Sequence, residues 1–430
     1  GLRLKLNKGG GALVMSKDGR NLYLLSGGQI SKVDMNSGQL KGMSYNAEFE
    51  WKKPEERAYL FDHVWQQVVD KFYDPAIHNI DWAFYKKEYA RFLPYINNNY
   101  DFAEMLAELL GELNASHTGA SYKGGGSSSQ TAALGVFYDE TFDGDGLKIK
   151  EILEKGPLDL TSGKIKPGMI IRKINNQEIK KGQDYFQILE DLSGKRVMLT
   201  IYDPSTKKEW EEYVKPTTYG NQNGLLYNRW VKQRQEMVEK LSNGKIGYVH
   251  VKSMDSPSFR KVYSEILGKY RNKEAIIVDT RYNGGGWLHE DLLHLLSGKK
   301  YAEFVPRGQF IGEDPFTQWN KPSAVLVSES NYSNAHGFPW AYKELGLGKV
   351  IGMPVPGTMT AVWWETLMDP SLVFGIPQVG MKDNQGRILE NMQLEPDIKV
   401  TNDPASAMKG RDLQLEAAVE SLMKEISRRP

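Results

Sequence analysis

Short apolar segments separated by glycine-containing turns open the chain. Residues 10–40 contain the segments ALVM, LYLL and ISKVDM, with DG, GG and SG pairs between them. Such alternation predicts consecutive antiparallel strands. One sheet of this size cannot bury its own apolar face, so we expect residues 1–48 to be the end of an upstream β-repeat. A small meander packed on the main body of the protein is the alternative.

A helical pattern follows over residues 49–125. In AYLFDHVWQQVVDKFYD and DFAEMLAELLGEL, apolar residues recur at intervals of three and four, which predicts amphipathic helices between residues 53 and 113. The polar run YKGGGSSSQT, from Tyr122 to Thr131, then has the composition of a flexible connector. This run also fits an engineered replacement for a longer loop.

Residues 126–220 have the pattern of a small β domain. The segments LGVFYDE, GLKIKEIL, GMIIRKIN and KRVMLTIYD each predict a strand. The stretch from Lys166 to Ile171, KPGMII, resembles the strand that follows the carboxylate-binding region in PDZ domains of the peptidase-associated kind. This resemblance implies a domain that binds extended chain ends by adding a strand to a sheet edge. A domain that only braces the rest of the protein is the alternative.

Residues 221–430 alternate between buried strands and helices. Continuous apolar runs in KIGYVHV, AIIVD and SAVLVSE predict strands, and SFRKVYSEILGKYR, LHEDLLHLLSG and LQLEAAVESLMKEI predict helices. Another helix is expected to begin near Phe338, and KVIGMPV and LVFGIP are expected to continue the alternation as strands. This pattern favours an α/β core whose sheet is covered on both faces.

Composition narrows the classes of function. The chain has 55 Lys and Arg residues and 54 Asp and Glu residues, which gives a net charge of +1. This balance does not indicate a basic surface for binding nucleic acid. Cysteine is absent, which excludes disulfides, a cysteine nucleophile and cysteine-ligated zinc. No apolar run approaches the roughly 20 residues that a membrane span needs.

Two segments at strand ends carry residues suited to chemistry. The segment Asp279–Gly286, DTRYNGGG, exposes backbone N–H groups that can hold an oxyanion or a phosphate, although it matches neither a Walker loop nor a dinucleotide fingerprint. Ser333 follows the next strand, before a helix and without a GxSxG elbow around it. Its hydroxyl is either a helix N-cap or a nucleophile supported by the helix dipole.

A serine nucleophile needs a base. His117 is the best candidate, because small neighbours in NASHTG leave its imidazole accessible; a helix-capping histidine is the alternative. His336 is too close to Ser333 in sequence to face it. Glu390, at the end of an apolar segment, is suited to orient a catalytic group, and an ordinary surface carboxylate is the alternative.

Several motifs, taken together, resemble the tricorn-type branch of the C-terminal processing peptidases. They are ELNASHT, IVDTRYNGGG, NYSNAHGF, KELGLGKVIG, and LEN followed by Pro396 and Asp397. The resemblance covers essentially the whole chain. It implies a multidomain α/β protein with a spiral ββα, crotonase-like catalytic core, a helical subdomain and an inserted PDZ domain. Members of this branch carry β-propellers upstream, which fits a propeller remnant at residues 1–48.

The same resemblance assigns roles to individual residues. It implies that Ser333 is the nucleophile and His117 the general base, with Ser116 and Glu390 completing a tetrad that tunes the base. The oxyanion hole would be formed by the backbone N–H groups of Asn334 and of Gly285 or Gly286.

One departure from the family pattern leaves two registers open. Related enzymes often have Ser at alternate positions, whereas this series reads Asn331, Ser333, Ala335 and then His336 in place of an acidic residue. Alignment from Phe338 without a gap puts the nucleophile on Ser333, which we prefer. A shift of two residues puts it on Ala335 and implies an inactive protein.

Two functions follow from these observations. The first is a serine peptidase that hydrolyses unfolded chains or oligopeptides through an acyl-enzyme on Ser333, and the presence of both Ser333 and His117 favours it. The second is a catalytically dead peptide-binding protein of the same fold. A crotonase-like acyl-CoA enzyme fits less well, because such enzymes do not need a serine nucleophile.

The remaining expectations concern substrate, partners and location. The stretch Tyr301–Gly308 is a candidate lining for the substrate pocket, where Glu303 would favour a basic side chain. We expect no metal, no other cofactor and no nucleic-acid partner, and the resemblance implies a homo-oligomer. Because the chain starts at Gly1, we expect a fragment of a longer protein, whose export or periplasmic location is favoured over a cytoplasmic one.

Overall fold

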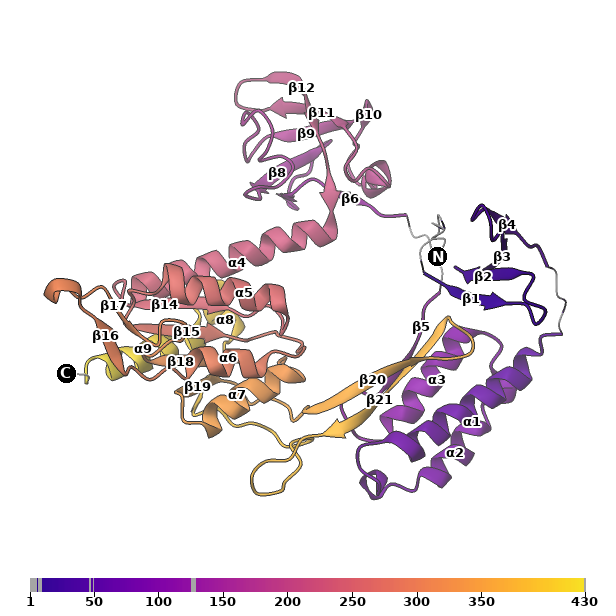
Figure 1. Ribbon diagram of the computed structural model, residues 1–430. Helices are drawn as coiled ribbons and strands as arrows, with labels where there is room; N and C mark the ends of the chain where they lie inside the picture. Colours follow the sequence, from indigo (N-terminus) through magenta and orange to yellow (C-terminus); the bar gives the residue numbers. More distant parts are fainter. Residues whose placement is uncertain (1–5, 7–9, 46–47, 49, 125–128, 429–430) are drawn as a thin grey trace. The chain divides into compact units, whose positions relative to one another are not determined.

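The computed structural model describes residues 6, 10–45, 48, 50–124 and 129–428, and the chain divides into two units, residues 1–57 and 58–430. The first unit contains a four-stranded antiparallel sheet whose strands pair in chain order, as predicted (Figure 1). These strands are β1 (Ala12–Met15), β2 (Leu22–Ser26), β3 (Gln29–Val33) and β4 (Leu40–Gly42). Leu24 and Val33 are buried in this sheet, whereas the whole of β1 is exposed.

Helices dominate the next part of the chain, as predicted. They are α1 (Lys53–Lys71), α2 (Trp82–Ala90) and α3 (Asn99–Gly111), with 3₁₀ turns at Ile77–Asn79 and Leu93–Tyr95. Asp81 and Asn98 cap the N-termini of α2 and α3 with their side chains. The connector expected at Tyr122–Thr131 includes residues 125–128, which lie outside the described part of the chain.

A small antiparallel sheet shares a core with these helices. Its strands, in the order β20-β21-β5, are β20 (Thr360–Thr366), β21 (Leu372–Gly380) and β5 (Gly119–Tyr122). Phe374 of β21 packs in one cluster with Leu106 of α3, and Figure 1 shows the β20–β21 hairpin beside α3. The segment LVFGIP is therefore a strand, as predicted, but it belongs to this sheet and does not continue the α/β alternation.

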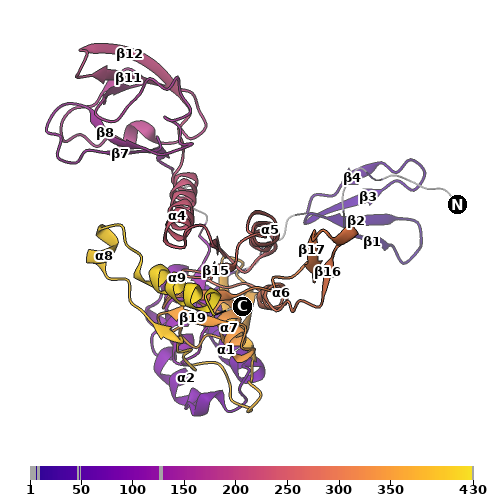
Figure 2. The same cartoon turned by 90° about the vertical axis from the view of Figure 1, so that its left-hand side faces the viewer.

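The predicted β domain forms an antiparallel sheet with its own apolar core. Its strands, in the order β12-β11-β9-β8-β7 with β10 on β9, are β7 (Val136–Tyr138), β8 (Leu147–Ile152), β9 (Ile170–Ile174), β10 (Gln177–Glu178), β11 (Val197–Asp203) and β12 (Lys208–Val214). A 3₁₀ turn spans Phe186–Leu189, and β6 (Ala132–Ala133) pairs with β13 (Thr217–Thr218). Helix α4 (Tyr219–Leu241) then runs from this domain to the rest of the unit (Figures 1 and 2).

A parallel sheet forms the α/β core that the sequence predicts. Its strands, in the order β14-β15-β18-β19-β22, are β14 (Ile246–His250), β15 (Ala275–Asp279), β18 (Ser323–Val327), β19 (Lys349–Gly352) and β22 (Ile398–Lys399). One face packs against α5 (Ser256–Ser264), its π-helical extension Glu265–Lys269, α6 (His289–Leu296) and α7 (Asn334–Glu344). The other face packs against α4 and α9 (Leu413–Ile426).

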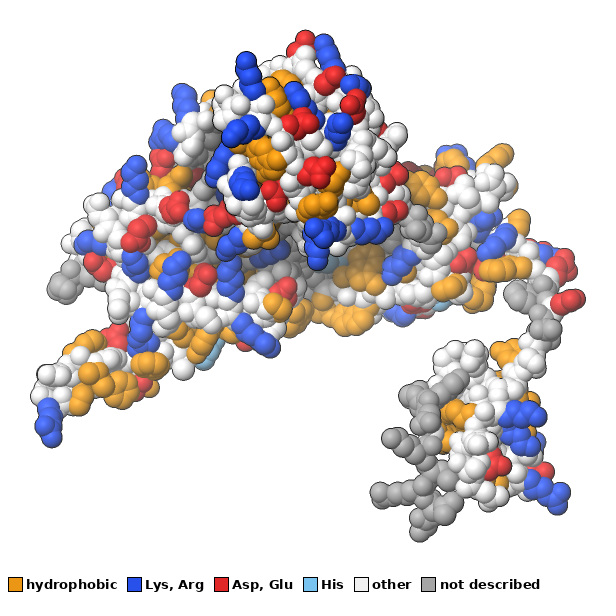
Figure 3. Space-filling view, turned by 90° about the horizontal axis from the view of Figure 1, so that it is seen from above, with side chains coloured by type: hydrophobic (Ala, Val, Ile, Leu, Met, Phe, Trp, Pro, Cys, Tyr) orange, Lys and Arg blue, Asp and Glu red, His pale blue; other side chains and the backbone are white. Residues whose placement is uncertain are grey.

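Peripheral elements complete the second unit. They are the hairpin of β16 (Ala302–Phe304) and β17 (Gly312–Asp314), the 3₁₀ turn Pro306–Gly308 between them, and α8 (Pro404–Met408). Within the described residues, no helix is long and apolar enough to cross a bilayer. On the face seen in Figure 3, Lys and Arg side chains are interspersed with Asp and Glu.

Helix α7 begins four residues earlier than the sequence suggested, at Asn334 and not near Phe338. Pro339 lies inside the helix, and its missing N–H would leave the carbonyl of Ala335 without its usual donor. The side-chain amide of Asn331 donates to that carbonyl at 3.2 Å. The helix can therefore start directly after Ser333 despite the proline.

A buried ion cluster fixes the loop that follows β15. The guanidinium of Arg281, only 1% exposed, donates to the carboxylates of both Asp279 and Asp412 at 2.7–3.1 Å. Burial opposes the charged forms, yet the ion pair holds the pKa of Asp279 below its ordinary value and raises the pKa of Arg281. The cluster joins the end of β15 to the N-terminus of α9, where Asp412 is the cap.

We expect Arg281→Ala to destabilise the protein by about 3–5 kcal/mol, because two buried carboxylates would lose their counter-charge. Lys424→Ala is the matched control, since it removes an exposed ion pair with Glu420 on α9 and should change stability by no more than about 0.5 kcal/mol. Urea unfolding followed by circular dichroism measures both variants. Equal midpoints for the two variants would contradict a stabilising role for the cluster.

Candidate active site

Ser333 lies in a tight turn between β18 and α7. Its backbone has φ 57° and ψ −125°, the conformation of the second residue in a type II′ turn, where glycine is usual. The N–H of Ala335 closes the turn by donating to the carbonyl of Tyr332 at 3.0 Å. The Ser333 hydroxyl occupies the N-cap position of α7 but makes no capping hydrogen bond. The structure therefore does not support the plain helix cap, because the hydroxyl has no capping partner.

The glycine-rich loop permits this turn. A Cβ atom on Gly285 would lie 2.6 Å from the Cβ of Ser333 and 2.8 Å from the carbonyl oxygen of Tyr332. Only glycine therefore lets the loop approach the turn this closely. The N–H of Ser333 also donates to the hydroxyl of Thr358 at 2.8 Å, and the N–H of Tyr332 donates to the carbonyl of Asn283 at 3.1 Å.

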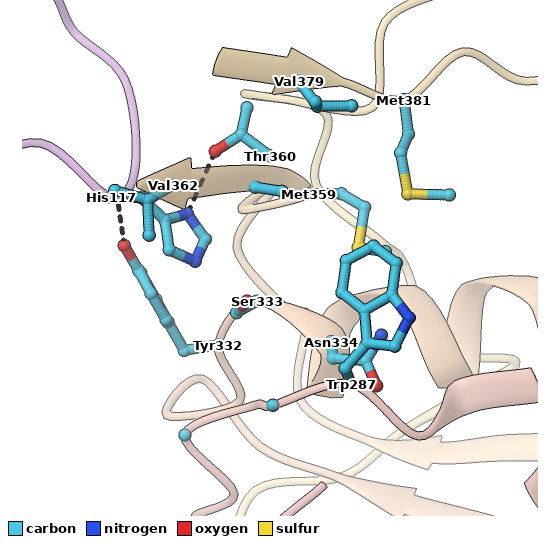
Figure 4. Close-up of a pocket in the computed structure, with 13 residues that line it drawn as sticks. His117, Trp287, Tyr332, Ser333, Asn334, Met359, Thr360, Val362, Val379 and Met381 are labelled. Atoms are coloured by element: carbon cyan, nitrogen blue, oxygen red, sulfur yellow. Dashed lines mark hydrogen bonds between the residues drawn. The ribbon is translucent and has the colours of Figure 1, made fainter. Parts of the chain in front are cut away.

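His117 reaches the same place from the end of the helical segment. Its backbone N–H donates to the Tyr332 hydroxyl at 2.7 Å, and the two rings lie 4.7 Å apart between centroids. Its Nδ1 atom lies 2.8 Å from Ser116 Oγ and 3.0 Å from Thr360 Oγ1. In Figure 4 the opposite edge of the imidazole faces the Ser333 side of the cavity. Among the described residues, no hydrogen bond joins His117 to Ser333, a contact that often forms only when substrate binds.

Hydrogen bonds from Ser116 assign the tautomer of His117. The Ser116 hydroxyl donates to Glu390 Oε2 at 3.0 Å, and the Ser116 backbone N–H donates to Glu390 Oε1. Because the one hydrogen of this hydroxyl goes to Glu390, we assign the hydrogen between Ser116 Oγ and His117 Nδ1 to Nδ1, which donates it to Ser116 Oγ. Nε2 is then unprotonated, which is the form that a general base needs.

Burial sets the charges in this network. It lowers the pKa of His117 below its ordinary value, so the imidazole is neutral near pH 7. Burial also raises the pKa of the Glu390 carboxyl, and the two hydrogen bonds from Ser116 oppose that rise. A neutral imidazole with a free Nε2 is ready to accept a proton.

Two backbone N–H groups beside Ser333 are free to bind an anion. Within the described residues, the N–H groups of Gly286 and Asn334 have no protein acceptor. Gly285, the alternative that the sequence left open, donates its N–H to the side chain of Asn283 at 2.8 Å. Gly286 is therefore the better donor, and Asn334 adds the N-terminus of α7.

One cavity of about 330 Å³ brings the candidates together. Ser333, His117, Gly286 and Asn334 all line it. Ala335, which the alternative register would make the catalytic position, is fully buried inside α7.

Two other candidates lie away from this cavity. Glu303 is not among the residues that line it; this carboxylate lies on β16 and pairs with Lys300. The sequence-based expectation that Glu303 shapes the substrate pocket is therefore not supported within this chain. His336 is buried, and burial lowers its pKa to about 4, while its Nδ1 accepts the N–H of Thr358 at 3.3 Å. This histidine does not line the cavity either.

Three residues of this site were missed by sequence reasoning. The hydroxyl of Thr360 contacts both Ser116 and His117, the hydroxyl of Tyr332 holds the backbone of His117, and the hydroxyl of Thr358 holds that of Ser333. Single hydroxyl residues carry no motif, so only the folded arrangement reveals their roles. In the described part of the chain, no group of three or more His, Asp or Glu side chains is placed to hold a metal ion.

Comparison with known proteins shows which families this chain is similar to. Residues 245–400 match the family model described as Peptidase family S41, and residues 53–111 match the Tricorn protease C1 domain. The tricorn protease of Thermoplasma acidophilum is 23% identical over 385 residues, which cover 86% of this chain and 35% of that protein. Tricorn protease homolog 1 of Streptomyces coelicolor is 25% identical over 391 residues, which cover 89% of this chain and 36% of that protein.

The fold comparison gives the same result. A crystal structure of the tricorn protease superposes with a TM-score of 0.82 at 19% identity, covering 97% of this chain and 41% of that one. The chain therefore contains a Peptidase family S41 domain and a Tricorn protease C1 domain, and its similarity is to the tricorn-type members of that family. It spans about a third of the length of the two curated relatives named above.

We expect the imidazole of His117 to titrate below pH 6.5, because burial disfavours its charged form. Histidine NMR signals followed against pH measure this titration, and His117→Gln identifies the signal by its loss. The neutral form should carry its hydrogen on Nδ1, which ¹⁵N shifts distinguish from Nε2. Titration above pH 6.5, or a hydrogen on Nε2, would contradict the hydrogen-bond network described here.

Proposed function

We propose that this chain hydrolyses peptide bonds through an acyl-enzyme on Ser333, with His117 as the general base. The observation that carries the proposal is the turn at Ser333. Its hydroxyl makes no capping bond and lines the same cavity as the imidazole of His117. A strained turn at the end of a strand, ahead of a helix, is how many hydrolases expose a nucleophilic serine.

Acylation would begin with attack of Ser333 on the substrate and end with release of the leaving amine. Ser333 Oγ attacks the carbonyl carbon of the scissile bond while His117 Nε2 takes the hydroxyl proton. The negative charge that develops on the carbonyl oxygen is stabilised by the N–H groups of Gly286 and Asn334. Collapse of this tetrahedral intermediate breaks the C–N bond, and His117 gives its proton to the leaving amine.

Deacylation would repeat these steps with water. His117 takes a proton from water, the resulting hydroxide attacks the ester carbonyl, and the same two N–H groups hold the oxyanion. The ester bond then breaks, and the proton on His117 returns to Ser333 Oγ. The products of this step are a carboxylic acid and the free enzyme. The proposed reaction is complete with water alone as the second substrate.

Ser116, Glu390 and Thr360 are positioning residues in this scheme. Ser116 Oγ accepts a hydrogen bond from the Nδ1–H of His117 and donates one to Glu390. Through this chain of hydrogen bonds, the carboxylate stabilises the imidazolium that forms during acylation. Thr360 Oγ1 lies 3.0 Å from both Ser116 Oγ and His117 Nδ1, and it limits rotation of the ring. None of the three touches the reacting atoms.

The proposed substrates are unfolded chains or oligopeptides. The main chain of such substrates is free of secondary structure and can extend into the cavity beside Ser333. We place the second candidate, a catalytically dead peptide binder, below the enzyme because Ser333, His117 and Glu390 are all present in connected positions. The β7–β12 domain is proposed as a PDZ-like peptide-binding module, and the β1–β4 sheet, with its exposed β1, as one blade of a longer array.

Ser333→Ala and His117→Ala should each lower kcat/KM for peptide cleavage by about 10⁴-fold or more, because they remove the nucleophile and its base. Glu390→Ala should cause a smaller loss, because Glu390 acts through Ser116. Cleavage of internally quenched peptides measures all three variants. A Ser333→Ala protein that still cleaved would refute the assignment.

A matched pair on β20 serves as the control. Thr360→Val removes the hydroxyl beside His117, and we expect it to lower kcat with little change in KM. Thr366→Val makes the same change at an exposed position on the same strand and should leave both constants unchanged. Equal effects of the two variants would remove Thr360 from the network.

A further inference from the structure

The cavity beside Ser333 is lined without acidic residues, lysine or arginine. Thirteen residues line it, and none of them is Asp, Glu, Lys or Arg. The side chains that form its apolar wall are those of Trp287, Met359, Val362, Val379 and Met381. A cavity of about 330 Å³ lies at the lower end of the usual range for ligand sites and is large enough for one bulky side chain.

This apolar wall lies in the same cavity as the proposed catalytic groups. Figure 4 shows Trp287 and Met381 on the opposite side of the view from His117, with Ser333 between His117 and Trp287, and with Asn334 next to the base of the Trp287 side chain. Trp287 directly follows Gly286, whose N–H is a proposed oxyanion donor. A substrate carbonyl held by Gly286 and Asn334 would therefore place a neighbouring side chain against Trp287 and the two methionines.

Physical chemistry decides which side chain fits. A charged side chain in this cavity would lose water without gaining an opposite charge among the lining residues. An apolar side chain would instead remove its own surface and that of the wall from water. Met359 and Met381 are flexible and polarizable, so they can adapt to aliphatic or aromatic groups.

We propose that this cavity selects substrates with a large, uncharged, apolar side chain next to the scissile bond. This inference rests on the proposed peptidase function and adds the substrate class. It replaces the expectation of a basic side chain, because Glu303 is paired with Lys300 and does not line the cavity.

The test uses internally quenched peptides that vary only in the two residues flanking the scissile bond. Each position carries Phe, Leu, Lys or Glu in turn, and kcat/KM is measured for the native protein. We expect Phe and Leu to exceed Lys and Glu by about tenfold or more at one of the two positions. Equal rates at both positions, or a preference for Lys or Glu, would overturn the inference while leaving the peptidase function intact.

Two variants assign the preference to this cavity. Val379→Glu adds a carboxylate to the wall at a site that is 43% exposed in the native protein, and Met381→Glu is a second variant in case the first does not fold. Either change should lower the ratio of Phe to Lys cleavage at least tenfold. Met368→Glu, in the turn of the same hairpin and 67% exposed, adds the same charge outside the cavity and should leave the ratio unchanged.

The outcomes distinguish a failure of this substrate preference from a failure of the proposed peptidase function. If folded Val379→Glu and Met381→Glu proteins keep the native ratio, the cavity does not select the substrate and the inference fails. If the native protein cleaves none of the peptides, the proposed function fails and this inference fails with it.

Discussion

The arrangement depends on a backbone conformation at Ser333 that residues with a side chain rarely adopt. A φ of 57° with ψ of −125° costs on the order of 1–3 kcal/mol, so the surroundings must hold it. Gly285 leaves room for the turn, and Thr358 accepts the N–H of Ser333. In the same turn the Ser333 hydroxyl makes no cap hydrogen bond to α7, and Ser333 and Asn334 both line the cavity. The strained turn, the proposed nucleophile and the proposed oxyanion site are thus one local feature.

The site also joins two separate cores. His117 and Ser116 follow α3, whose core includes the β20–β21 hairpin, whereas Ser333 follows β18 of the parallel sheet. The hydrogen bonds of Ser116 to Glu390 and of His117 to Tyr332 connect segments that are more than 200 residues apart in the chain. The proposed base, His117, and the proposed nucleophile, Ser333, therefore come together only when the two cores are packed together. Substitutions at that junction should affect catalysis before they affect either core.

Much of the fold could be predicted from hydrophobic periodicity, because each strand or helix is a local property of the chain. The segment LVFGIP shows the limit, since its pattern indicates a strand but not the sheet that it joins. The start of α7 was missed because the compensation for Pro339 comes from the side chain of Asn331. In the site, motif resemblance suggested Ser333 and His117, while Thr360 and the choice of Gly286 over Gly285 depend on tertiary contacts that leave no local signal.

The most direct test of the central claim is intact-mass analysis after exposure to a fluorophosphonate, followed by peptide mapping. An activated serine reacts with this probe, whereas an ordinary surface hydroxyl does not. We expect one adduct per chain, located on Ser333, and slower labelling of the His117→Ala variant. A folded native protein that forms no adduct, or forms it on a different serine, would contradict the account.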